Sequence, residues 1–95
     1  MKVAIVFTME GCPFCEMIKE EFKKNNIDII PRDIDEHKEE YDAFVDATGS
    51  DYVPAIMLLT LDENENANNV KLLAPDKDFE DIYEAVEMTK GYLLD

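Results

Sequence analysis

The chain has 95 residues, of which 46% are hydrophobic, and this suits one globular domain better than two domains or a disordered segment. Lysine and arginine number 9 against 23 aspartates and glutamates, which gives a formal net charge of −14 at pH 7. We therefore expect no nucleic acid and no anionic membrane surface as partner, because both need a basic protein surface.

The first predicted strand leads directly into a pair of cysteines. Residues 2–8 form a short apolar run rich in β-branched side chains, which is typical of a buried strand. A helix is expected from Pro13 to about Lys24, because proline suits the first helical turn, where its missing N–H costs nothing. Cys12 then lies at the start of this helix, where free backbone N–H groups and the helix dipole favour a thiolate over a thiol.

A second strand and a second helix are predicted next. Residues 27–34 favour a strand parallel to the first, because a strand, a helix and a strand joined by so short a crossover form a right-handed βαβ unit. The second helix is expected over residues 36–48, with Asp33 or Asp35 as its N-cap and Gly49 at its end.

Two further strands are predicted over residues 55–61 and 70–73. The acidic, asparagine-rich residues 62–69 separate them, which indicates an antiparallel hairpin with a long loop. With the elements before and after it, this hairpin predicts an α/β fold. A βαβ unit is followed by a ββα unit, and the resulting four-stranded mixed sheet is flanked by three helices.

The last helix is expected to begin near Phe79 and to end at Gly91. Asp76 or Asp78 is the expected N-cap, because a short acidic side chain can accept hydrogen bonds from the free N–H groups of the first turn. The spacing of the apolar residues predicts an inner face, made of Phe79, Ile82, Tyr83 and Val86.

The cysteine pair itself admits three readings. A structural disulfide is a poor one, because closing so short a loop removes little chain entropy. A structural zinc site needs four ligands, and His37 is the only other soft candidate in the chain.

Without a leader-like segment or an apolar run approaching the ~20 residues of a membrane span, we expect a cytoplasmic protein with no membrane contact. In that reducing compartment, redox chemistry is the reading that we favour for Cys12 and Cys15.

The predicted order of elements, the pair Cys12-Pro13-Phe14-Cys15 and the dipeptide Val53-Pro54 before the third strand together resemble the thioredoxin fold, and within it a dithiol glutaredoxin. The resemblance implies that residues 1–95 form a single glutaredoxin-like domain. It also implies that Cys12 is the nucleophile, that Cys15 resolves the mixed disulfide, and that Pro54 is cis and places the Val53 backbone beside a bound peptide.

The resemblance also implies a substrate or glutathione site. Its expected residues are Met9, Phe14, Tyr52, Val53, Pro54, Asp76 and Asp78. Three features depart from the family pattern. Met9 stands where many glutaredoxins have a lysine, Tyr52 replaces a threonine, and residues 73–78 lack the glycine pair that precedes the last helix.

The function implied by the resemblance is the reduction of protein disulfides or glutathione mixed disulfides. Glutathione would be a co-substrate, with no tightly bound cofactor and no metal. The partners would be disulfide-containing proteins, of which ribonucleotide reductase is a natural example, and the protein would be a monomer. Two alternatives remain open at this stage. One is a protein-dithiol reductase that depends on a thioredoxin-reductase-type flavoenzyme and uses little glutathione, and the other is a non-enzymatic, redox-switched binding module.

Overall fold

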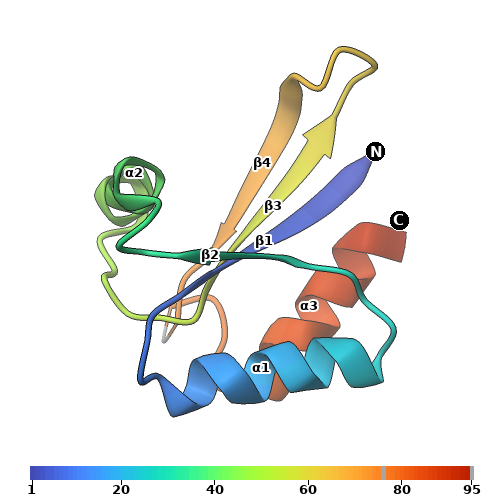
Figure 1. The fold of residues 1–95 in the computed structure, drawn as a ribbon. Helices are drawn as coiled ribbons and strands as arrows, with labels where there is room; N and C mark the ends of the chain where they lie inside the picture. The colour runs from blue at the N-terminus through green and yellow to red at the C-terminus, as the bar shows by residue number, and fades with distance from the viewer. Residues whose placement is uncertain (76, 95) are drawn as a thin grey trace.

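The fold is given by a computed structural model that describes residues 1–75 and 77–94. Along the chain the elements are β1 (Lys2–Thr8), α1 (Pro13–Lys24), β2 (Ile30–Asp33), α2 (Lys38–Thr48), β3 (Ala55–Leu61), β4 (Ala67–Leu73) and α3 (Ile82–Leu94). The strand order is β2-β1-β3-β4, with β1 parallel to β2 and the other two pairs antiparallel. The predicted four-stranded mixed sheet with three flanking helices is therefore confirmed for the described residues (Figure 1).

The two faces of the sheet bury separate apolar clusters, because side chains alternate between the faces along each strand. Val6 of β1 joins a cluster with α1 and α3, in which Phe22 is fully buried. Phe7 points to the other face and packs against α2, where its ring centroid lies 5.6 Å from those of both Tyr41 and Phe44. One strand thus anchors helices on both sides of the sheet (Figure 1).

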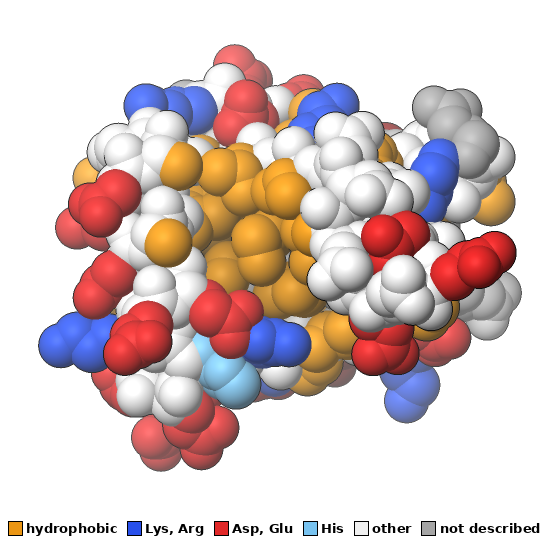
Figure 2. Space-filling view, turned by 90° about the horizontal axis from the view of Figure 1, so that it is seen from above, with side chains coloured by type: hydrophobic (Ala, Val, Ile, Leu, Met, Phe, Trp, Pro, Cys, Tyr) orange, Lys and Arg blue, Asp and Glu red, His pale blue; other side chains and the backbone are white. Residues whose placement is uncertain are grey.

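α2 covers only part of its face of the sheet. Met57, Leu59 and Leu72 pack around the cluster under α2 but stay partly exposed, and Val70 is exposed. Figure 2 shows apolar side chains gathered in a hollow on the upper side of the molecule. Some apolar sheet surface therefore remains accessible next to α2.

The beginning of α2 differs from the prediction. Neither Asp33 nor Asp35 is the N-cap, which is His37, and the His37 side chain makes no capping hydrogen bond. The Asp33 carboxylate instead accepts a hydrogen bond from the Asp35 backbone N–H at 2.8 Å, so it stabilises a turn before the helix. The C-terminal prediction is confirmed, because Gly49 ends α2 with a left-handed φ of 74°.

The predicted second strand was longer than β2, and the predicted fourth strand was shorter than β4. β2 begins at Ile30 and not at Ile27, and Ile27 and Ile29 pack half-buried against the cluster of α1 and α3. β4 begins at Ala67, earlier than the apolar run that starts at Val70, because pairing with β3 continues past the apolar residues.

The last helix also begins later than expected. α3 starts at Ile82, and the Asp81 carboxylate accepts a hydrogen bond from the Glu84 N–H at 2.8 Å, as an N-cap does. Asp78 is therefore not the cap, and Asp76 lies outside the described residues. The helix continues through Gly91 to Leu94, so the predicted end was wrong.

Among residues 1–75 and 77–94, no helix combines the length and the apolar character needed to cross a membrane.

Candidate functional site

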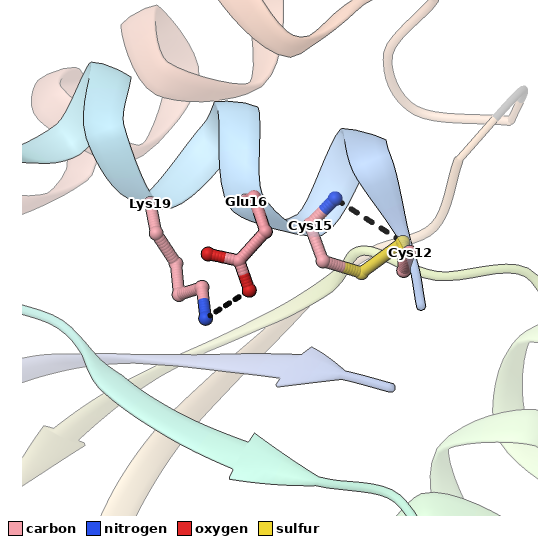
Figure 3. Close-up of polar contacts among 4 residues, drawn as sticks. All are labelled: Cys12, Cys15, Glu16 and Lys19. Atoms are coloured by element: carbon pink, nitrogen blue, oxygen red, sulfur yellow. Dashed lines mark hydrogen bonds and ion pairs between the residues drawn. A yellow bond between two sulfur atoms is a disulfide. The ribbon is translucent and has the colours of Figure 1, made fainter. Parts of the chain in front are cut away.

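Cys12 and Cys15 are joined by a disulfide at the start of α1, with their Cα atoms 5.2 Å apart (Figure 3). Cys12 precedes the helix and keeps 9% of its surface exposed, whereas Cys15 lies inside the first turn and is 1% exposed. An incoming sulfur can therefore reach Cys12 before it can reach Cys15.

The Cys12 sulfur caps the helix. Cys12 is the N-cap of α1, its backbone is extended, and its Sγ accepts a hydrogen bond from the Cys15 N–H at 3.1 Å (Figure 3). Pro13 occupies the first helical position, as predicted, and sets the helical φ there. Because the free N–H groups and the dipole both favour negative charge at this end, we expect a reduced Cys12 to be stabilised as a thiolate.

Glu16 is the acid nearest to Cys12 within α1, one turn into the helix. Its carboxylate forms an ion pair with Lys19 at 3.0 Å, and the pair lies on the exposed surface (Figure 3). The lysine offsets part of the repulsion that Glu16 would exert on a Cys12 thiolate, although water screens both charges.

The Val53-Pro54 peptide bond is cis, as predicted. Phe7 of β1 pairs with Ala55 of β3. Pro54, the residue before Ala55, therefore lies at the end of β1 that leads to Cys12. The fold thus brings the loop of residues 52–54 to the same end of the sheet as the cysteine pair.

A groove with a volume of about 410 Å³ lies between the first turns of α1, the loop of residues 52–54 and the beginning of α3. It is lined by Phe14, Met17, Tyr52, Val53, Pro54, Pro75, Phe79, Glu80, Asp81, Ile82 and Tyr83. Pockets of roughly 300–1,000 Å³ hold small molecules, so this groove is large enough for a few side chains of a partner.

Comparison with known proteins identifies the family. The family model described as Glutaredoxin matches residues 4–58, which is more than half of the chain and includes both cysteines and the cis proline. The chain belongs to the glutaredoxin family.

Solved structures agree with this assignment at the level of the fold. The thioredoxin-like protein BC3987 matches with a TM-score of 0.59 and 19% identity, over 90% of this chain and 97% of that one. Its T8A mutant matches with a TM-score of 0.60 and 17% identity, over 92% of this chain and 97% of that one. No curated protein sequence matches the chain.

The groove brings together four of the binding residues predicted from the glutaredoxin resemblance. Phe14, Tyr52, Val53 and Pro54 all line it. Met9, which is half-exposed, lies in the connection before Cys12 and is not among the lining residues.

Asp78 of the predicted glutathione site is not among the residues that line the groove. The Asp78 carboxylate accepts a hydrogen bond from the Ala74 N–H at 2.8 Å, so it stabilises the connection between β4 and α3. Asp78 lines a smaller hollow beside Lys77 and Glu84. Asp76 lies outside the described residues, and its predicted role stays a prediction.

Several lining residues were not predicted as site residues. Tyr83 was assigned to the buried face of the last helix, but it is 58% exposed and lines the groove. Asp81 was the sequence signal that could have corrected this assignment, because an N-cap at Asp81 begins α3 at Ile82. The buried face of α3 is formed by Ala85, Val86 and Thr89.

His37 lies at the start of α2 and is not among the residues that line the groove. Its Nδ1 is 3.4 Å from the Glu40 carboxylate at the start of α2. Within residues 1–75 and 77–94, no three or more His, Cys, Asp and Glu side chains are placed to hold a metal ion.

Proposed function

We propose that this member of the glutaredoxin family reduces disulfides through Cys12 and Cys15, acting on protein disulfides or glutathione mixed disulfides in a reducing cytoplasm. The observation that carries the proposal is the position of the Cys12 sulfur. It caps α1, accepts a hydrogen bond from the Cys15 N–H and belongs to the more exposed of the two cysteines.

The exchange proceeds in two steps. The Cys12 thiolate attacks one sulfur of the substrate disulfide, which forms a mixed disulfide and releases the other sulfur as a thiolate that takes up a proton. The Cys15 sulfur, after losing its proton, then attacks Cys12 and releases the second substrate sulfur. Two electrons pass to the substrate, and the protein is left with the Cys12–Cys15 disulfide.

The protein needs a reductant to return to the dithiol state. Glutathione can serve by the reverse exchange, with no tightly bound cofactor. The groove favours a second candidate, a protein-dithiol reductase that is recycled by a flavoenzyme of the thioredoxin-reductase type, because none of the described residues that line it is a lysine or an arginine.

Turnover assays with two reductants test the proposal. The wild-type protein should reduce a glutathione mixed disulfide with glutathione and glutathione reductase, or a protein disulfide with the flavoenzyme and NADPH. Cys12→Ser should abolish turnover in every assay, whereas Cys15→Ser should retain only exchange with a glutathione mixed disulfide, because that reaction needs one thiol.

Circular dichroism of each variant serves as the folding control. Turnover that survives Cys12→Ser in a folded protein would overturn the proposed role of Cys12. A wild-type protein that turns over with neither reductant, yet binds a partner only in one redox state, would replace the enzyme by a redox-switched binding module.

A further inference from the structure

The groove, which is lined by Phe14 from between the two cysteines, presents large apolar side chains to solvent. Phe14 is 61% exposed, Tyr52 62% and Tyr83 58%, and Met17 is half-exposed. These four come from α1, from the loop before β3 and from α3, so the fold gathers them from distant parts of the chain. Exposed aromatic residues that converge on one groove are typical of surfaces that bind an apolar partner.

The charged residues of the groove are acidic. Glu80 and Asp81 line it, and no lysine or arginine is among its lining residues within the described parts of the chain. The whole chain, these two acids included, has a net charge of −14, so the electrostatic potential around the groove favours cations over anions.

Two lysines on the segments that border the groove have other contacts. Lys19, on α1, pairs with Glu16. Lys77, in the connection before α3, donates a hydrogen bond to the Thr48 backbone oxygen at the end of α2 and lines a separate hollow with Glu80 and Glu84. Glutathione has more carboxylates than ammonium groups, so it is an anion at neutral pH, and the described lining of this groove offers it no cationic side chain.

We propose that the groove selects polypeptide disulfides that carry an aromatic or aliphatic side chain next to the cysteine and a lysine or arginine close by, in preference to glutathione. This inference rests on the proposed function, because it names the substrate class of the same site. The apolar side chain packs among Phe14, Tyr52 and Tyr83, and the cation lies against Glu80 and Asp81.

The reaction with such a substrate is the exchange already described. The Cys12 thiolate forms a mixed disulfide with the peptide cysteine and displaces its partner thiol, and Cys15 then releases the peptide thiol. In the test below, dithiothreitol supplies the two electrons that reduce the Cys12–Cys15 disulfide beforehand, and it is removed before the substrate is added.

The test compares four disulfides as substrates of the prereduced protein. Three are peptides that share one leaving thiol and differ around the cysteine, namely phenylalanine with lysine, phenylalanine with glutamate and serine with lysine, and the fourth is oxidised glutathione. We expect the peptide with phenylalanine and lysine to react about ten times faster than the peptide with glutamate. Exposed charge pairs each contribute up to a fewfold in affinity, and two acids act here.

Two double variants separate the groove from the overall charge. Glu80→Gln with Asp81→Asn should remove most of the preference for lysine over glutamate, and asparagine keeps the N-cap of α3. The control, Glu39→Gln with Asp46→Asn, removes the same charge from exposed positions of α2, on the other face of the sheet, and should keep the preference. Tyr83→Ser should reduce the preference for phenylalanine over serine.

The outcomes of the two proposals differ. If the wild type reduces all four substrates at similar rates, or favours oxidised glutathione, the substrate class is wrong and the proposed function stands. An equal loss of preference in the two double variants would also overturn the role of the groove. If the wild type reduces none of the four, the proposed function fails.

Discussion

Replacing Tyr41 by phenylalanine should stabilise the fold. Tyr41 is 8% exposed, and its hydroxyl has no hydrogen-bond partner among the described residues. A buried hydroxyl without a partner costs roughly 1–3 kcal/mol. The ring packs 5.6 Å from Phe7 and 6.5 Å from Phe44, measured between centroids, and phenylalanine keeps these contacts.

We expect a gain near the lower end of that range, about 1 kcal/mol, because Tyr41 retains a little exposure. For a chain of this size such a gain raises Tm by about 4–8 °C. Urea unfolding at pH 7, followed by circular dichroism, measures it. Tyr83→Phe is the matched control, since the exposed Tyr83 hydroxyl carries no burial cost and its removal should leave stability unchanged.

The same variant has a signature at alkaline pH. Burial, followed by the charges of Asp51 and Asp42, raises the pKa of Tyr41 above its ordinary value of 10.0. The unfolded chain therefore loses this proton before the folded protein does. Titration of Tyr41 leaves the free energy of unfolding unchanged well below pH 10.0 and lowers it as the pH rises from there through the folded pKa. Tyr41→Phe should show a shallower alkaline decline. A decline as steep as in the wild type, or a loss of stability at pH 7, would refute this reasoning.

Three other changes test the helix ends and the core. In Cys15→Ser, thiolate absorbance should show Cys12 ionising at lower pH than a free cysteine, because the helix N-terminus stabilises the anion; ionisation at or above the free-thiol range would contradict this. Phe22→Ala should lower the free energy of unfolding by about 3–5 kcal/mol, since Phe22 is fully buried, and a loss below about 1 kcal/mol would be inconsistent with that packing. Asp81→Ala should cost about 1 kcal/mol and Asp81→Asn much less; equal losses would argue against the cap.

Much of the fold could be predicted from the sequence, because local patterns agreed with one another. The apolar run before Cys12, Pro13 at the first helical position and Gly49 at a helix end each have one structural meaning. The cysteine pair between β1 and α1 and the dipeptide Val53-Pro54 before β3 also predicted part of the groove, namely its lining by Phe14 and residues 52–54.

The rest depended on competition between similar side chains. Asp78 and Asp81 are both good N-caps, and only the folded chain decides that Asp78 bonds to Ala74 while Asp81 caps α3. Tyr83 follows this cap in the first turn of α3 and lines the groove. In the same way Asp33 stabilises a turn and leaves the start of α2 to His37. Sequence reasoning identifies such candidates, but it does not rank them.

β4 forms one edge of the sheet, and within the described residues it pairs only with β3. The outer N–H and C=O groups of such an edge can pair with a strand of another molecule, and residues 67–71 are exposed. At neutral pH the charge of −14 makes copies of the chain repel one another. That repulsion disappears near the isoelectric point, about pH 4.2, so acidification removes the colloidal protection of this edge, and light scattering during an acid titration would detect the resulting association.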